Sequence, residues 1–194
     1  MEFTSNFLNE AKSICDNLDK SKIEEMVNRI AKLKDKKGRL FVLGVGGSAA
    51  NSSHAVNDFR KLTNIESYAP TDNVSELTAR TNDEGWDSVF VNYLKCSNLD
   101  KDDAILIFSV GGGDLEKNVS INLCKALDYA KSLQAQTLSI TGRDQGYSAK
   151  NADCNLTVPV RNSKNLTPLT EAFQGIIWHL LVSHPLLKMN ETKW

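Results

Sequence analysis

Four short apolar runs constrain the fold most strongly, because each is rich in β-forming residues and is bounded by Gly, Asp or Pro. They cover residues 40–45, 104–110, 137–141 and 155–160. Runs of this length predict buried strands, and the sequence between them has the periodicity of helices. Strands that alternate with helices form a parallel sheet covered on both faces. The sequence therefore predicts an α/β sandwich, with a fifth, weakly signalled strand at 67–69.

Apolar residues that recur every three or four positions mark the helical segments. Residues 3–36 predict one or two long helices, whose expected role is packing against a partner helix. Three further helices are expected at 48–62, 115–133 and 168–187. No repeat, low-complexity tract or shift in composition divides the sequence. We therefore expect residues 1–194 to form one domain.

Composition and charge argue against several classes of protein. The 194 residues include 23 Lys+Arg and 24 Asp+Glu, and a formal net charge of -1 provides no general attraction to nucleic acid or anionic membrane. No apolar run approaches the roughly 20 residues that span a bilayer. The N-terminus is amphipathic and acidic where a signal peptide would be basic and then apolar. The four cysteines are far apart, so we expect no disulfide framework or zinc ribbon, and a cytoplasmic location.

Glycines and hydroxyls follow three of the predicted strands, at 44–48, 109–113 and 141–146. Loops that follow parallel strands meet at one edge of the sheet, where ligands bind. Free amides and the positive end of a helix favour an anion at such a junction, although close helix packing also selects glycine. The loops together predict a site for a phosphorylated small molecule. The candidate binding residues are Gly46, Gly47, Ser48, Ser109, Gly111, Gly112 and Gly113.

Polar side chains interrupt two of the predicted helices. His54 and Asp58 are four residues apart, so they share one helix face and can address a common proton or metal. Glu171, Gln174 and His179 interrupt an apolar series near the C-terminus, which indicates a polar pocket at a buried interface. The alternatives are a surface His–Asp pair in the first helix and a core histidine with satisfied hydrogen bonds in the last.

Five blocks of the sequence, taken together, resemble the sugar isomerase (SIS) fold family and, within it, the phosphoheptose isomerases. The blocks are GVGGSAANSSH, SELTARTNDEGW, FSVGGGDLEKNV, ITGRDQGY and TPLTEAFQGIIWH. The resemblance implies a SIS-type three-layer sandwich whose central parallel sheet has about five strands. It implies conversion of sedoheptulose 7-phosphate to D-glycero-D-manno-heptose 7-phosphate. It also implies a homotetramer, with residues 3–36 used in oligomerisation and active sites at subunit interfaces, and a zinc ion in some members.

The resemblance assigns substrate-binding roles residue by residue. Ser48 matches the serine of the first phosphate loop, and Ser109 matches the first hydroxyl of the second. Asn82 belongs to an Asn-Asp block of the active site, and we expect Gln174 to join the same site. Residues 111–113 are three glycines where the family has a hydroxyl-rich loop. We expect their backbone amides, with Lys117, to replace the lost donors, unless the phosphate is held differently or the ligand differs.

The resemblance also implies catalytic and metal-binding roles. Asp58 falls where the family has a catalytic glutamate, His179 matches the catalytic histidine, and Asp83 matches an active-site aspartate. Glu171 aligns with a glutamine that is a zinc ligand in some members, and its added charge would suit a divalent cation. The implied zinc ligands are His54, Asp58, Glu171 and His179. Glu171 and His179 are about 12 Å apart along a continuous helix. Three arrangements remain open: the two side chains lean toward each other, Glu171 precedes the helix, or Glu171 belongs to a neighbouring subunit's site.

Aldose–ketose isomerisation needs a base for the carbon proton and an acid or metal at the neighbouring oxygen. The two expected proton-transfer groups are Asp58 and His179, and zinc would polarise the substrate oxygens. One alternative is a non-catalytic tetramer that binds phosphosugars or proteins, and another is an isomerase of a different sugar phosphate. The presence of His54, Asp58 and His179 favours an enzyme, because binding alone does not require them.

Overall fold

The computed structural model describes residues 1–192, and its centre is a parallel sheet. Within that range the sheet has five strands in the order β2-β1-β3-β4-β5. The predicted fold class is confirmed, and each predicted strand overlaps an observed one. The strands are β1 Leu40–Leu43, β2 Ser67–Tyr68, β3 Ala104–Ser109, β4 Gln136–Thr141 and β5 Cys154–Thr157.

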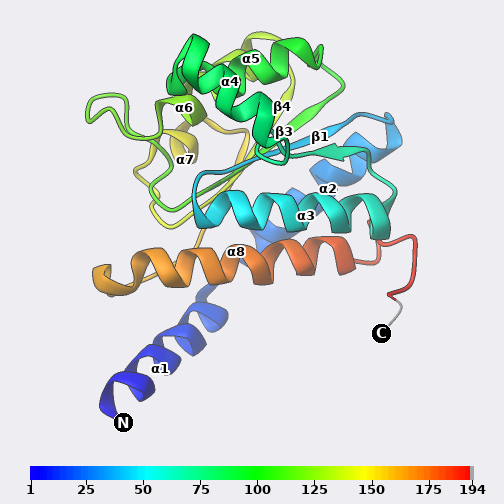
Figure 1. Ribbon diagram of the computed structural model, residues 1–194. Helices are drawn as coiled ribbons and strands as arrows, with labels where there is room; N and C mark the ends of the chain where they lie inside the picture. The colour runs from blue at the N-terminus through cyan, green and yellow to red at the C-terminus, as the bar shows by residue number, and fades with distance from the viewer. Residues whose placement is uncertain (193–194) are drawn as a thin grey trace.

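Helices cover both faces of the sheet, which gives three layers (Figure 1). Alternate strand residues serve the two faces: Leu106 and Phe108 belong to one apolar core, and Ile105 and Ile107 belong to the other. The first core includes α2, α3 and α8, and the second includes α5 and α6. The helices are α1 Glu2–Asn17, α2 Lys20–Asp35, α3 Gly47–Thr63, α4 Val74–Glu84, α5 Val89–Cys96, α6 Ile121–Ser132, α7 Tyr147–Asn151 and α8 Leu166–Ser183, with short 3-10 helices η1 Trp86–Ser88 and η2 Ser163–Asn165.

The helix predicted over 3–36 is divided into α1 and α2. Asp19 caps α2, because its carboxylate accepts a hydrogen bond from the Lys22 amide at 3.1 Å. α2 lies in the first core, whereas α1 buries only Ile14 and projects from the body of the molecule (Figure 1). No helix in residues 1–192 is both long enough and apolar enough to cross a bilayer.

The prediction of a helix from residue 115 was wrong, because α6 begins only at Ile121. The Asp114 carboxylate accepts hydrogen bonds from the amides of Glu116 and Lys117, and its backbone pairs with that of Val119. These bonds close a turn that competes with the first turn of a helix. Helices α4, α5 and α7 were not predicted.

Candidate active site

α3 and α8 lie side by side and run in the same direction (Figure 1). Gly47, at the start of α3, lies against Glu171, and His54 lies beside Trp178 and His179 further along both helices. Parallel helices advance equally per residue, so contacts made at their starts are followed by contacts between residues a similar number of positions on. This packing brings together two polar helix faces that are far apart in the sequence.

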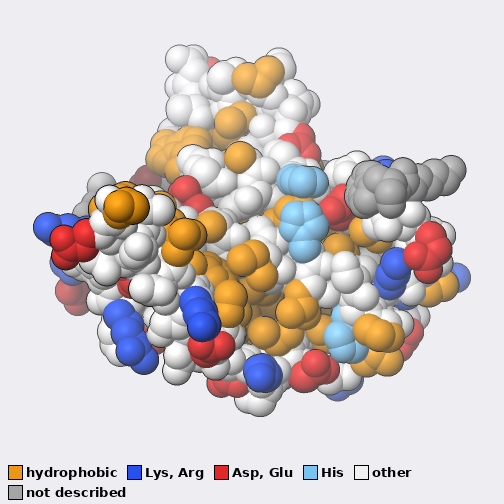
Figure 2. Space-filling model, turned by 90° about the horizontal axis from the view of Figure 1, so that it is seen from below, with side chains coloured by type: hydrophobic (Ala, Val, Ile, Leu, Met, Phe, Trp, Pro, Cys, Tyr) orange, Lys and Arg blue, Asp and Glu red, His pale blue; other side chains and the backbone are white. Residues whose placement is uncertain are grey.

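A cluster of two imidazoles and one carboxylate lies where these faces meet. Asp58 Oδ2 is 3.9 Å from His54 Nε2 and 3.9 Å from His179 Nε2. The Asp58 side chain is only 6% exposed, whereas the histidine side chains are 59% and 55% exposed. A buried carboxylate is therefore covered by two imidazoles that solvent can reach. Figure 2 shows two histidines side by side on this face, among apolar side chains.

Hydrogen bonding defines the tautomer of His179. Its Nδ1 lies 2.7 Å from the carbonyl oxygen of Gly175, which can only accept a hydrogen bond. Nδ1 therefore carries the proton, and Nε2 presents a lone pair toward Asp58 in the neutral ring. The buried Trp178 stacks on His179 with ring centroids 3.5 Å apart, and its ring centroid lies 4.6 Å from that of His54. Both imidazoles are thus packed against one indole.

The cluster has the donor set of a transition-metal site. One ligand atom from each of His54, Asp58 and His179 lies within 4.8 Å of the others. Imidazole nitrogens with a carboxylate oxygen suit Zn²⁺ and similar divalent ions, and three protein ligands leave a coordination position for substrate. The hydrogen bond of His179 Nδ1 to a carbonyl is the usual outer-shell support for a ligating histidine. These residues therefore fit a divalent metal.

Glu171, the fourth predicted metal ligand, is not brought to the cluster within one chain. A Cβ atom added at Gly47 would lie 2.5 Å from Glu171 Oε2, so the carboxylate covers the first turn of α3. The eight-residue separation from His179, about 12 Å along α8, is the physical reason, because the helix is continuous. The carboxylate instead lies at the positive end of the α3 dipole.

Ser48 and Gln174 bond to each other across the buried interface between α3 and α8. Ser48 Oγ donates to Gln174 Oε1 at 3.0 Å, and Asn51 Nδ2 donates to the same oxygen at 3.1 Å. Asn51 Nδ2 also donates to the Glu171 carbonyl at 2.9 Å. The predicted phosphate-loop serine is therefore already engaged and only 2% exposed. The role of Asn51 was missed, although it lies on the same face as Ser48, one turn later.

The second glycine loop is held by hydrogen bonds to Ser109 and to the start of α7. Ser109 Oγ accepts a hydrogen bond from the Gly112 amide at 3.0 Å, and the Gly112 carbonyl accepts from Ser148 N and Oγ. Gly112 and Gly113 have φ values of +77° and +84°, which glycine adopts without strain. Tyr147 N donates to the Gly113 carbonyl. These glycines shape a loop that packs against the start of α7, and one of the amides expected at a phosphate is already used.

Three other predicted residues lie apart from the cluster. Lys117 Nζ is 3.2 Å from Asp114 Oδ2, because both belong to the turn before α6. Asn82 Nδ2 donates to Asp83 Oδ1 at 2.8 Å, and both side chains are exposed near the end of α4. α4 lies with α5 on the sheet face opposite α3 and α8 (Figure 1). A single chain therefore does not bring Asn82, Asp83 or Lys117 to the histidines.

Comparisons with known proteins agree on the fold family. The family model described as "SIS domain" matches residues 6–142. A lincomycin biosynthesis protein of Streptomyces lincolnensis is 32% identical over 154 residues, covering 76% of this chain and 56% of the relative. A probable phosphoheptose isomerase of Thermoplasma volcanium is also 32% identical over 154 residues, covering 77% of this chain and 75% of the relative. The structure of a phosphoheptose isomerase from Neisseria gonorrhoeae superposes with a TM-score of 0.78 at 23% identity, covering 93% of this chain and 95% of that one.

Proposed function

This chain belongs to the SIS domain family, and we propose that it is an isomerase that converts sedoheptulose 7-phosphate to D-glycero-D-manno-heptose 7-phosphate. The observation that carries the proposal is the convergence of His54, Asp58 and His179 where α3 and α8 pack together. A protein that only binds sugar phosphates has no need of such a cluster. The names of relatives such as the Thermoplasma protein support the same reaction and the same substrate.

The reaction moves one proton from a carbon beside the carbonyl and exchanges protons on the neighbouring oxygens. Asp58 is the group that takes the carbon proton, because its carboxylate faces the two imidazoles and is otherwise buried. His179 Nε2 exchanges a proton with a substrate oxygen, because its Nδ1 is committed to the Gly175 carbonyl. Trp178 limits the movement of the His179 ring during this exchange.

We infer that zinc is the metal that these residues hold. His54, Asp58 and His179 would bind it, and the ion would polarise the substrate oxygens when bound. Ligand and proton-transfer roles compete for Asp58 Oδ2, which faces both imidazoles, and for His179 Nε2, because a nitrogen that binds zinc cannot also take up a proton. Glu171 would join the ligands only at a site completed by another subunit.

We also propose that this one-domain chain forms a cytoplasmic homotetramer through α1 and α8. Phe3 and Leu8 are exposed on α1, and Ile176 and Leu180 are exposed on α8. Exposed apolar residues on these two helices favour burial against other copies of the chain. β5 and α8 lie beyond residue 142 and extend the same sheet and the same core, which supports one domain.

The test is a product assay with purified protein and sedoheptulose 7-phosphate, in which NMR detects the heptose phosphate. Formation of that product is expected. Binding of the substrate without any product would favour the non-catalytic alternative.

The glycines at 111–113 also support a second candidate, an isomerase of another sugar phosphate, because this loop lacks side-chain donors. A panel of phosphorylated ketoses of different length distinguishes the two reactions. A faster conversion of another ketose phosphate would favour this second reaction.

A further inference from the structure

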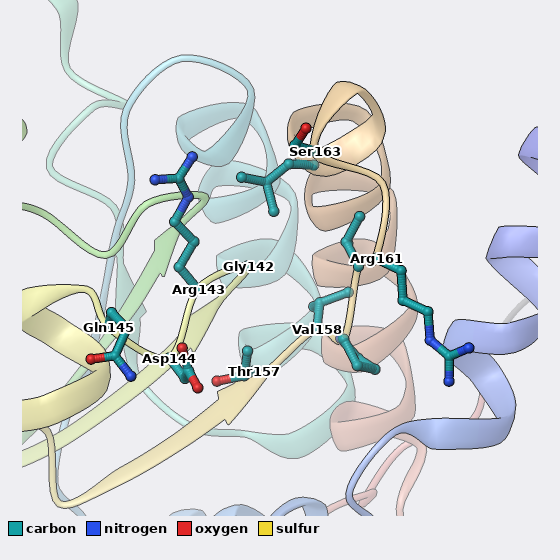
Figure 3. Close-up of a pocket in the computed structure, with 11 residues that line it drawn as sticks. Gly142, Arg143, Asp144, Gln145, Thr157, Val158, Arg161 and Ser163 are labelled. Atoms are coloured by element: carbon teal, nitrogen blue, oxygen red, sulfur yellow. The ribbon is translucent and has the colours of Figure 1, made fainter.

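A cavity of about 590 Å³ opens where β4 and β5 end. Its lining includes Arg143 and Arg161, together with Asp144, Thr157 and Ser163. Figure 3 shows the two arginine side chains pointing away from each other, with Arg161 directed toward α1. It also places Asp144 beside Thr157, at the opposite end of the cavity from the Arg143 guanidinium. The cavity thus carries two cations and one anion, and the Asp144 carboxylate points away from the Arg143 guanidinium.

Arg143 emerges beside the loops that were predicted to bind phosphate. The preceding residue, Gly142, donates its amide to the Val110 carbonyl at 3.0 Å. A Cβ atom at Gly142 would lie 2.2 Å from Thr170 Oγ1, a buried hydroxyl with no hydrogen-bond partner. Gly142 is therefore wedged between the end of β3 and the first turns of α8. Arg143 follows it at the sheet edge where the starts of α3 and α8 also lie.

The donors predicted for the phosphate are largely committed elsewhere. Ser48 donates to Gln174 and Lys117 pairs with Asp114, while Ser109 Oγ accepts from the Gly112 amide and keeps its own hydrogen to donate. The Glu171 carboxylate covers the start of α3, where a phosphate would meet electrostatic repulsion. The positive charge for an anionic ligand must therefore come from another residue at this edge.

Arg143 is suited to supply that charge. Within residues 1–192 no carboxylate forms an ion pair with Arg143, and the side chain is exposed. The start of α8 adds positive potential, because its first turn has no acidic residue and no side-chain cap, and Leu166 and Ser163 line the cavity. A guanidinium binds phosphate through paired, charge-assisted hydrogen bonds.

The geometry points to Arg143, at the edge of this cavity, as the residue that binds the phosphate of the sugar substrate in place of the missing hydroxyls. This inference rests on the proposed function. Seven residues of α3, about 10 Å, separate the start of that helix from His54. An extended seven-carbon sugar phosphate can bridge such a length, with its carbonyl end at the cluster and its phosphate near Arg143.

The test measures binding separately from turnover. Calorimetric titrations with inorganic phosphate and with unphosphorylated sedoheptulose would compare the wild type with Arg143→Gln, Arg143→Lys and Arg161→Gln. We expect Arg143→Gln to weaken phosphate binding at least tenfold and to leave sedoheptulose binding unchanged. Arg143→Lys should recover most of the loss. Arg161→Gln, the matched control from the same cavity, should stay within twofold of the wild type.

Steady-state kinetics with sedoheptulose 7-phosphate complete the test. Arg143→Gln should raise KM at least tenfold with kcat within threefold of the wild type. The inference is overturned if phosphate binding is unchanged in Arg143→Gln, or if sedoheptulose binding falls equally. A wild type that binds phosphate through Arg143 but forms no product would contradict the proposed function and leave this inference standing.

Discussion

Asp58 Oδ2 lies 3.9 Å from His179 Nε2, although the carboxylate belongs to α3 and the imidazole to α8. The carboxylate is buried and the imidazole is more than half exposed. Such a pair can present one proton donor and one proton acceptor to the same substrate. The relation depends on the packing of two helices, so it connects the stability of the fold directly with the proposed chemistry.

Replacing His179 by Ala is expected to lower turnover at least about 100-fold, the lower range for loss of a general acid or base. The fold should persist, because the side chain is 55% exposed. The product assay measures turnover, and circular dichroism follows folding. His184→Ala is the control, since His184 ends α8 and its Nδ1 accepts from the Leu186 amide. Turnover that survives in His179→Ala would remove His179 from the mechanism.

The purified protein is expected to contain a divalent metal, and His54→Ala and Asp58→Asn should each lose most of it. Each change removes one of three clustered donors. Elemental analysis by mass spectrometry gives the metal content, independently of activity. Glu171→Gln should keep its metal if the three donors of one chain suffice. Equal metal content in all four proteins would contradict a site built on His54 and Asp58.

Asp103→Asn should lower the free energy of unfolding by about 3 kcal/mol, because it leaves a half-buried guanidinium without its anion. The Asp103 side chain is 4% exposed and accepts from the Arg39 amide, Nε and Nη2 at 2.9, 3.1 and 2.5 Å. Urea unfolding measures the loss. Lys36→Ala removes an exposed pair with Asp102 and should change the free energy of unfolding by less than about 1 kcal/mol. Similar losses of unfolding free energy in both variants would show that burial does not make the Arg39–Asp103 pair more stabilising than an exposed pair.

Glu10 should contribute to stability at neutral pH and lose that contribution in acid. Burial opposes its ionisation, but hydrogen bonds from Asn162, Asn165 and Arg161 outweigh burial and lower the pKa of Glu10 below 4.5. A lowered folded-state pKa stabilises the protein above the unfolded-state pKa, and the effect disappears as pH falls through the folded-state value. The difference in unfolding free energy between wild type and Glu10→Gln should therefore shrink below about pH 4.5.

Urea unfolding at several pH values measures this difference. Glu116→Gln, an exposed position with no acceptor role for its carboxylate among the described contacts, is the control. A difference for Glu10→Gln that stays constant from pH 7 to pH 3 would show that its hydrogen bonds do not depend on the charge.

The strands were predictable because runs such as 104–108 are continuously apolar, as strands buried on both faces must be. The late start of α6 was not predictable, because the helical pattern near Leu115 gives no sign that the Asp114 carboxylate will accept hydrogen bonds from the amides of Glu116 and Lys117. Helix α4 was missed because it buries no side chain completely, so its sequence lacks an apolar stripe.

Part of the site was visible in the sequence, because His54 and Asp58 are neighbours on one helix by spacing alone. Their contact with His179 depends on how α3 and α8 pack, which no local pattern specifies. The separation of Glu171 from His179 could be foreseen from helical rise. The engagement of Ser48 by Gln174 could not, since it arises only when the two helices meet.

The parallel packing of α3 and α8 restricts which insertions the contact between these two helices can accept during evolution. One residue inserted between Gly47 and His54 would rotate every later side chain of α3 by about 100° and carry Asp58 away from α8. An insertion between Glu171 and His179 would likewise rotate the later side chains of α8, His179 included, away from α3. Side chains between α3 and α8 can therefore be substituted one at a time, but the number of residues from Gly47 to His54 and from Glu171 to His179 must stay the same.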